Sequence, residues 1–236
     1  MHKQLAQDQL YVTTDILILT VRSGQLDLLL SRRTAPPYQR CWALPGRFIG
    51  LDESAETSAK RLLAEMLPGQ NGALEQLYTF TDVNRDPRGR VISAAYLLVV
   101  PWEEIKEQVM GNQVSFRCFR IGLDEEGLKL TGDDGKNLEP GELAFDHGKI
   151  IETGIRRLRG KIDYSDIGFR FLKNRNAFTL SELQTVFEAV LGETLDSSNF
   201  RRAILGRYEK KGQLIRTDQS EQQCKGRPAA LYRFIF

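Results

Sequence analysis

Three arginines lie close together in a short charged segment, residues 84–90, which reads Asn-Arg-Asp-Pro-Arg-Gly-Arg. Guanidinium groups bind phosphate oxygens through paired hydrogen bonds, so Arg85, Arg88 and Arg90 suit a ligand that carries phosphate. A segment rich in Asp, Pro and Gly is also typical of a plain hairpin turn. The residue types alone therefore leave two interpretations open, a phosphate site and a turn.

Two glutamates follow a glycine at a regular spacing. Glu56 comes six positions after Gly50, and Glu65 comes nine positions after Glu56, while the preceding residues 42–46 read Trp-Ala-Leu-Pro-Gly. This arrangement resembles the Nudix hydrolase pattern Gx5Ex7REUxEExGU, in which U is an apolar residue. The resemblance covers roughly residues 10–150 and implies a Nudix-like domain.

The same alignment shows what this domain lacks. Ala64 takes the place of the arginine in the pattern, and Pro68 and Gly69 take the places of the two following glutamates. Magnesium needs several oxygen ligands in near-octahedral geometry, and a proline also breaks the helix that would carry them. We therefore expect no catalytic residues, no metal site and no enzymatic activity.

Two alternatives stay open for these residues. One is an active ADP-ribose pyrophosphatase with an atypical metal site made of Glu56, Glu65 and Glu53, in which Mg²⁺ or Mn²⁺ activates the attacking water. The other is that Gly50, Glu56 and Glu65 are only part of a loop and a helical face.

The segment 84–90 also resembles the loop of Nudix enzymes that act on ADP-ribose, which favours the ligand interpretation. Asp86 would then bind a ribose hydroxyl, and Arg47 would be a further phosphate ligand. Aromatic side chains, Tyr78 among them, are candidates for stacking on adenine, although aromatic residues more often belong to a core. The predicted effector-binding residues are Trp42, Arg47, Phe80, Arg85, Asp86, Arg88 and Arg90.

Strands and one helix are expected to position these side chains. The predicted strands are residues 11–21, 26–33, 42–49, 74–82, 90–100 and 114–121, the first two joined as a hairpin at Ser23-Gly24 and the third broken at Pro45-Gly46. Apolar residues recur with the helical period over 54–67, and Pro68-Gly69 ends that helix. A long helix with a basic end is predicted over 142–161 and links this half of the chain to the next.

The two halves of the chain differ in charge. Residues 149–236 carry 17 lysines and arginines against 10 aspartates and glutamates, a net of +7, whereas residues 1–148 carry 16 against 21, a net of −5. A basic unit joined to an acidic unit predicts two domains with different partners.

The basic half has the element order of a winged helix. Thr179 and Glu182 have the spacing of a capping box, and Asp196 begins a second cap. The predicted elements are helices over residues 180–191 and 199–211, and a two-stranded wing over 213–217 and 229–236. Helix, turn, helix and wing in this order are typical of DNA-binding domains.

The helical period divides the second of these helices into two sides. Phe200, Ala203, Ile204 and Tyr208 are predicted to pack inward. A recognition helix places its N-terminal residues at base edges, where arginine binds guanine and asparagine binds adenine, while basic residues beside it contact phosphates or the minor groove. The predicted DNA-binding residues are Ser198, Asn199, Arg201, Arg202, Arg207, Lys225, Arg227 and Lys173. The alternative is a small solvated helical hairpin with ordinary surface arginines.

Together the two halves resemble the Nudix-related transcriptional regulators of NAD metabolism, the NrtR family. The residues that carry the resemblance are 143–147 (LAFDH), 159–165 (RGKIDYS), 178–184 (FTLSELQ), 199–202 (NFRR) and 226–234 (GRPAALYRF). The resemblance implies a homodimeric repressor of the bacterial cytoplasm that binds a pseudo-palindromic double-stranded operator of NAD biosynthesis or salvage genes. It also implies ADP-ribose, or a related nucleotide, as the effector that releases DNA; a repressor that answers another nucleotide or sugar remains an alternative.

The expected fold class is α/β (α+β), a Nudix-like α/β/α sandwich followed by a winged helix-turn-helix domain. We expect an effector-binding domain over residues 1–148, a linker helix over 149–162 and a DNA-binding domain over 163–236. The three cysteines form no CxxC pair, which predicts reduced cysteines without a zinc site or a disulfide framework. We also expect no resident cofactor. No apolar run reaches the ~20 residues of a membrane helix, and the N-terminal residues have no apolar signal-peptide core.

Overall fold

The computed structural model describes residues 10–70, 72–112, 114–139, 141–220 and 229–236. It begins with the predicted hairpin, in which β1 (Tyr11–Arg22) and β2 (Gln25–Arg32) pair antiparallel. Ser23 and Gly24 both have positive φ, 51° and 72°, as a tight turn between two twisted strands requires. The hairpin prediction is confirmed.

The other strands extend this hairpin into one mixed sheet in the order β5-β6-β1-β2-β7-β8. They are β3 (Trp42–Ala43), β4 (Gly46–Phe48), β5 (Glu75–Phe80), β6 (Val91–Val99), β7 (Phe116–Asp124) and β8 (Gly127–Thr131). Strand β6 runs parallel to β1, and the short strands β3 and β4 pair with β2 and β1. All the predicted strands of this half are present, whereas β8 was not predicted.

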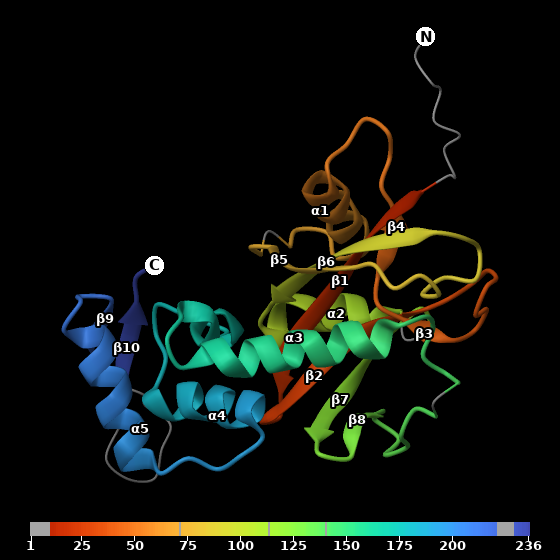
Figure 1. Cartoon of the computed structure of the whole chain (residues 1–236). Coiled ribbons are helices and arrows are strands. Elements are labelled where there is room, and N and C mark those ends of the chain that lie inside the picture. The colour runs from red at the N-terminus through yellow and green to blue at the C-terminus, as the bar shows by residue number, and fades with distance from the viewer. Residues whose placement is uncertain (1–9, 71, 113, 140, 221–228) are drawn as a thin grey trace.

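Helices cover both faces of the sheet, as Figure 1 shows. Helices α1 (Ala55–Met66) and α2 (Trp102–Gly111) share one hydrophobic cluster with Ile16 and Ile18 of β1. Helix α3 (His147–Ile162) packs on the other face, against Leu17 and Leu19. This alternation along β1 produces the predicted α/β/α sandwich. Helix α1 covers most of the predicted range 54–67 and begins after its N-cap Ser54, and α2 was not predicted.

The predicted start of the long helix is wrong. Helix α3 begins at His147 instead of residue 142. Phe145 has a φ of 54°, which is incompatible with an α-helix, where φ is negative. The preceding residues pair with β3: the Trp42 amide donates to the Glu142 carbonyl at 2.7 Å, and the Ala144 amide donates to the Trp42 carbonyl at 2.8 Å. Long-range strand pairing therefore overrides the apolar spacing of this segment.

Helix α3 approaches the sheet closely at Gly154. A Cβ atom built there would lie 2.2 Å from Cδ2 of Leu17 and 3.3 Å from Cδ2 of Leu77. We expect Gly154→Ala to lower the free energy of unfolding by about 1–3 kcal/mol, because both partners are buried core residues that must shift.

Gly160→Ala is the matched control, since Gly160 lies in the same helix and a Cβ there meets no atom within 4 Å. It is expected to stabilise the protein by about 0.5–1 kcal/mol, the helical preference of alanine over glycine. Urea unfolding of both variants measures the two effects, and equal stabilities would contradict the close-packing argument.

The second half of the chain has the predicted winged-helix order. Its elements are η1 (Asp166–Phe171, a 3₁₀ helix), α4 (Leu180–Leu191), α5 (Ser197–Ile204), η2 (Leu205–Glu209, a π turn), β9 (Leu214–Ser220) and β10 (Ala230–Phe234). The capping box at the start of α4 is present in full, and β9 pairs antiparallel with β10. The helix predicted over 199–211 is α5 together with η2, and η1 was not predicted.

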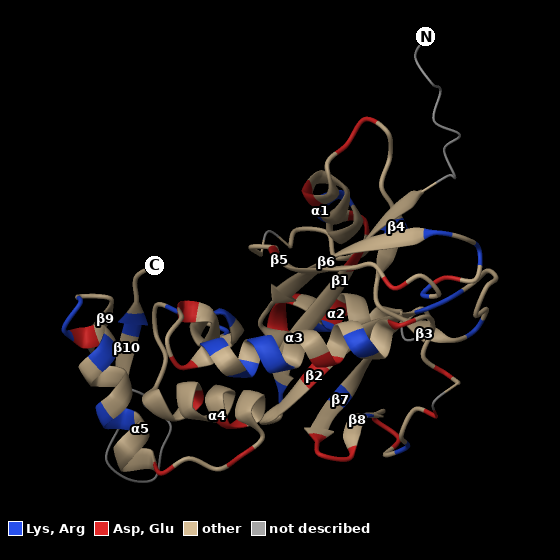
Figure 2. Cartoon of the chain, in the orientation of Figure 1, with Lys and Arg blue, Asp and Glu red and all other residues tan. Residues whose placement is uncertain are grey.

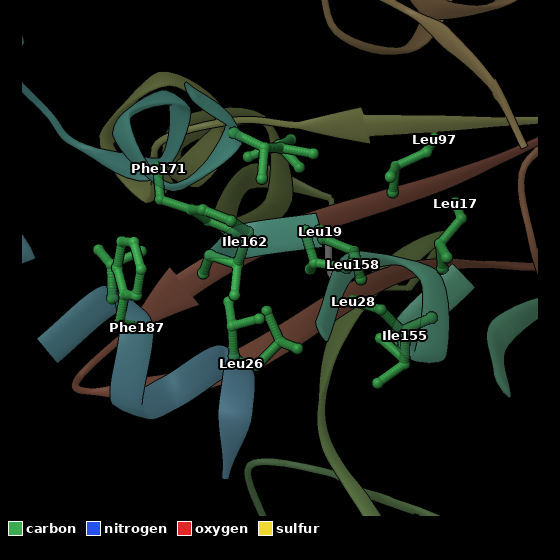
Figure 3. Close-up of a cluster of buried hydrophobic side chains, with 14 of the residues drawn as sticks. Leu17, Leu19, Leu26, Leu28, Leu97, Ile155, Leu158, Ile162, Phe171 and Phe187 are labelled. Atoms are coloured by element: carbon green, nitrogen blue, oxygen red, sulfur yellow. The ribbon is translucent and has the colours of Figure 1, made fainter. Parts of the chain in front are cut away.

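The two halves share one hydrophobic core. Ile162 at the end of α3 lies among Leu26 of β2, Phe171 of η1 and Phe187 of α4, as Figure 3 shows. Helix α3 therefore packs against the sheet and against the winged-helix unit at once. Within the described residues, no helix is long and apolar enough to cross a membrane.

Candidate effector pocket and DNA-binding helix

A polar cavity of about 180 Å³ lies where β1, β4, the 84–90 loop and the start of α3 meet. Four of the seven predicted effector-binding residues line it: Arg47, Arg85, Asp86 and Arg88. Gly46 makes room at its wall, because a Cβ there would lie 2.0 Å from Oδ1 of Asp15. The 84–90 segment is thus part of a pocket as well as a turn.

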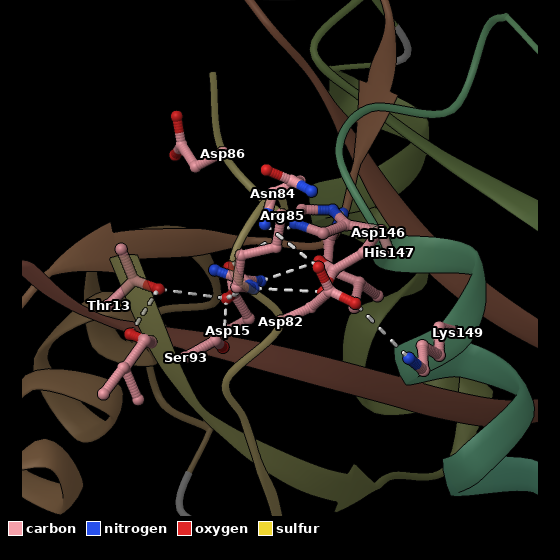
Figure 4. Close-up of polar contacts among 12 residues, drawn as sticks. Thr13, Asp15, Asp82, Asn84, Arg85, Asp86, Ser93, Asp146, His147 and Lys149 are labelled. Atoms are coloured by element: carbon pink, nitrogen blue, oxygen red, sulfur yellow. Dashed lines mark hydrogen bonds and ion pairs between the residues drawn. The ribbon is translucent and has the colours of Figure 1, made fainter. Parts of the chain in front are cut away.

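Buried charged groups form the floor of this pocket (Figure 4). The Arg85 guanidinium donates to both carboxylate oxygens of Asp146, at 3.0 Å from Nε and 2.8 Å from Nη2. Its Nη2 also lies 3.8 Å from Oδ2 of Asp15, which in turn accepts a hydrogen bond from Ser93. The Arg85 side chain is only 3% exposed, so these carboxylates compensate a fully buried charge.

His147 is the first residue of α3 and closes the same floor. Its Nδ1 accepts a hydrogen bond from the Leu44 amide at 2.8 Å, which leaves the proton of the neutral ring on Nε2, 3.8 Å from Asp15. Burial lowers the pKa of His147 below its ordinary value, because the imidazolium would lose its hydration.

This pKa shift predicts a pH dependence of stability. The unfolded chain binds a proton at His147 near pH 6.5, whereas the folded chain binds it only at lower pH. The neutral His147 therefore makes its full contribution to the free energy of unfolding above about pH 6.5, and this contribution is lost as the pH falls through the pKa of His147 in the folded chain. Urea unfolding between about pH 5 and 7.5 should show this slope. The pH dependence of the free energy of unfolding should be weaker in His147→Gln. An equally strong pH dependence in that variant would show that other titratable groups cause it.

Arginines and aromatic rings surround the mouth of the pocket. Arg88 donates to Asp86 through Nε at 3.0 Å and Nη2 at 2.7 Å, and its guanidinium lies 4.9 Å from the ring centre of Phe48 and 5.6 Å from that of Phe145. Arg33 lies 4.7 Å from the Phe145 ring. Arg47 bonds to Glu65 at 2.9 Å, while its buried Nε has no hydrogen-bond partner within the described residues. The mouth is therefore cationic and has donors to offer an anion.

The other three predicted effector-binding residues lie elsewhere. Trp42 is 8% exposed and packs edge-on against Phe119 in the core, with ring centres 5.2 Å apart. Phe80 is 5% exposed and lines a separate cavity beside Tyr78. Arg90 donates to the Thr81 and Asp82 carbonyls at 2.9 and 3.0 Å, which closes the base of the loop. The structure does not bring these three side chains into the pocket.

Sequence reasoning missed several residues that do line it: Asp15, Arg33, Phe48, Phe145 and His147. Arg33 and Phe48 carry no local signal, since Arg33 follows the last residue of β2 and Phe48 is the last residue of β4. Phe145 and His147 belong to the 143–147 stretch that carried the family resemblance, and this was the signal that could have found them.

The glutamates of the Nudix-like box are engaged with basic side chains. Glu53 bonds to Arg61 at 2.6 Å, Glu56 to Lys60 at 2.6 Å and Glu65 to Arg47 at 2.9 Å. The Arg61 guanidinium and the Gly50 amide lower the pKa of Glu53 to about 2. No group of three or more His, Cys, Asp or Glu side chains in the described part of the chain is arranged to hold a metal ion.

Helix α5 presents a basic surface on the winged-helix unit, visible as the blue segments of α5 in Figure 2. Ser198, Asn199, Arg201 and Arg202 are exposed, and Nη2 of Arg202 donates to Oδ1 of Asn199 at 2.7 Å. Asp196 caps the helix by accepting from the Asn199 amide at 2.8 Å. These four predicted DNA-binding residues therefore lie together on the first turns of one helix.

The remaining predicted DNA-binding residues are more scattered. Arg207 is half-buried near Tyr208, and Lys173 is exposed in the loop before α4. Lys225 and Arg227, at the predicted wing tip, lie outside the described residues. Of the residues predicted to face inward, Phe200, Ile204 and Tyr208 are buried. The prediction is wrong for Ala203, which is exposed and lines the groove between α4 and α5.

Known proteins resemble both units. A model of the NrtR DNA-binding winged helix domain matches residues 168–234. The ADPR responsive transcriptional repressor NtrR of Acinetobacter baylyi is 33% identical over 225 residues, which cover 94% of this chain and 81% of that protein. The crystal structure of Shewanella oneidensis NrtR complexed with a 27mer DNA is 32% identical, covers 95% of this chain and 93% of its own, and has a TM-score of 0.74. The ADP-ribose pyrophosphatase of Methanocaldococcus jannaschii is 28% identical over 67% of this chain and 83% of its own length.

The sheet with its polar pocket and the basic helix define a protein in which a Nudix domain is joined to a winged-helix DNA-binding domain. The identity to the A. baylyi repressor extends over both units and most of both chains. The chain belongs to the NrtR family of transcriptional regulators.

Proposed function

We propose that this protein is a homodimeric repressor of NAD biosynthesis or salvage genes that ADP-ribose, or a related nucleotide, releases from a pseudo-palindromic operator. The observation that carries the proposal is that one chain joins an arginine-lined pocket to a winged helix whose α5 exposes Arg201 and Arg202. The name of the A. baylyi relative, an ADPR responsive repressor, supports the choice of effector.

The pocket residues have chemistry that suits a nucleotide diphosphate. Arg33, Arg47 and Arg88 supply guanidinium groups for the phosphates, and Asp86 supplies a carboxylate for ribose hydroxyls. Phe48 and Phe145 replace Trp42 and Phe80 as the aromatic partners of the base. We propose residues 1–148 as the effector domain and 163–236 as the DNA-binding domain, with α3 between them.

Ser198, Asn199, Arg201 and Arg202 are proposed to face the major groove, because the N-terminal turns of a recognition helix contact base edges. Lys173, Arg207, Lys225 and Arg227 are proposed to bind the backbone or the minor groove.

Hydrolytic activity is proposed to be absent. The two glutamates that remain in the box, Glu56 and Glu65, are bound to Lys60 and Arg47, and the nearby Glu53 is bound to Arg61. A metal ion would have to displace these cations. Two further positions of the box are Pro68 and Gly69, which have no ligand atoms in their side chains.

The test is a gel shift on promoter fragments of NAD genes, with and without ADP-ribose. Binding that ADP-ribose abolishes is the expected result, and AMP and NAD at equal concentration serve as comparison ligands. Binding that ignores ADP-ribose would overturn the effector assignment. Release of AMP from ADP-ribose with Mg²⁺ or Mn²⁺ would establish the pyrophosphatase instead.

A further inference from the structure

The ion pair between Arg85 and Asp146 links the pocket to helix α3. Asp146 is the N-cap residue of α3, but its side chain makes no capping hydrogen bond, and both of its oxygens accept from Arg85 instead. The Arg85 side chain is buried, 3% exposed, and that of Asp146 is half-buried, 15% exposed. A residue in the usual position for capping a helix is thus bonded to the pocket loop instead.

The other end of α3 is fixed to the winged-helix unit. Arg159 donates to the Val190 carbonyl of α4 at 3.0 Å and to the Leu123 carbonyl of β7 at 3.0 Å. Helix α3 also packs against α4 and η1. Its 16 residues span roughly 24 Å, so one rigid element runs from the pocket to the domain that carries α5.

We propose that a phosphate of the effector takes Arg85 from Asp146, and that α3 transmits this exchange to the winged-helix domain. The proposal rests on the proposed effector function of the pocket. A phosphate competes well for Arg85, since it offers several charged oxygens to the same guanidinium fork. The freed Asp146 carboxylate then accepts from the first amides of α3, where the helix dipole favours a negative charge.

Asp146 therefore has two alternative sets of partners, Arg85 or its own helix. A ligand shifts a conformational equilibrium only by its different affinity for the two states. Arg85 supplies this difference, because it is occupied by Asp146 in the DNA-binding state and available to phosphate in the released state. Asp146 acts as a positioning residue, since it need not touch the ligand.

Asp146→Asn and Asp146→Ser test the proposal, because both side chains can still cap α3 but cannot form the ion pair. Without effector, both variants are expected to bind the operator more weakly by a typical coupling factor, about 5- to 150-fold. Calorimetry should show tighter binding of ADP-ribose than in the wild type, and ADP-ribose should cause little further release of DNA. Asp134→Asn, which removes the Asp134–Arg117 pair, is the matched control and should behave as the wild type.

Operator affinities of both Asp146 variants equal to that of the wild type would overturn the proposal. If these variants fail to melt cooperatively, Arg85→Lys replaces them: it keeps the charge but loses the two-bond fork, and a smaller loss of operator affinity is expected. No loss in that variant would also overturn the coupling. Failure of ADP-ribose to release the wild-type protein would instead reject the effector, since the variants' operator affinities are measured without ligand.

Discussion

Arg202→Ala should weaken operator binding by about 5- to 150-fold, because a bidentate arginine–guanine contact contributes about 1–3 kcal/mol of discrimination. Arg202 is exposed in the second turn of α5, and its bond to Asn199 orients the guanidinium before DNA arrives. The same bond occupies Oδ1 of Asn199, which an adenine contact would need. We therefore expect Arg202 to contribute more specificity than Asn199.

Gel-shift titration at fixed salt measures the loss, and base substitutions in each half-site locate the contact. Loss of a base contact should flatten the preference at one position, whereas loss of a phosphate contact weakens binding to all sequences and reduces the salt dependence. Arg120→Ala removes an exposed arginine from β7 and serves as the control. Wild-type operator affinity in Arg202→Ala would remove Arg202 from the interface.

Arg88→Ala should leave operator affinity unchanged and raise the ADP-ribose concentration needed for release by about 10- to 150-fold. Charge-assisted hydrogen bonds contribute about 1.5–3 kcal/mol, and Arg88 lies at the mouth of the pocket beside two aromatic rings. The fold should tolerate the change, because the Arg88 side chain is 40% exposed. The Asp86 carboxylate also still accepts from the backbone amide of residue 88 at 3.0 Å.

The measurement is release of operator DNA against ADP-ribose concentration, with calorimetric binding of ADP-ribose as a second readout. Arg120→Ala is again the control and should respond as the wild type. Release of Arg88→Ala at wild-type concentrations would exclude Arg88 from the effector site, and a parallel loss of operator affinity would indicate a role in the fold instead.

Local patterns in the sequence predicted most of the elements. The capping box at Thr179, the cap at Asp196 and the turn at Ser23-Gly24 each depend on neighbouring residues alone, and each is present. The start of α3 depends on pairing between residues 142–144 and β3, about a hundred positions away. The apolar spacing of residues 142–146 does not indicate this pairing, so the helix was predicted to begin too early.

The pocket was predictable only where its residues are neighbours in the sequence. Arg85, Asp86 and Arg88 share one loop, so their proximity follows from the sequence, and the fold adds Arg47 from β4. Trp42 and Phe80 have the right chemistry, but their strands turn them into the core. Phe145 reaches the pocket from a residue of positive φ, a backbone conformation that residue type did not indicate.

The shared core around Ile162, Leu26 and Phe187 has a consequence for unfolding and for hybrid proteins. Because α3 contributes apolar side chains to both units, separating them would expose those side chains to water. The whole chain should melt in a single calorimetric transition, and effector bound far from α5 should raise the melting temperature of the winged helix as well. A chimera that takes its winged helix from a relative, to change DNA specificity, should therefore be joined before His147. Helix α3 then comes from the same protein as the winged helix whose hydrophobic core it completes.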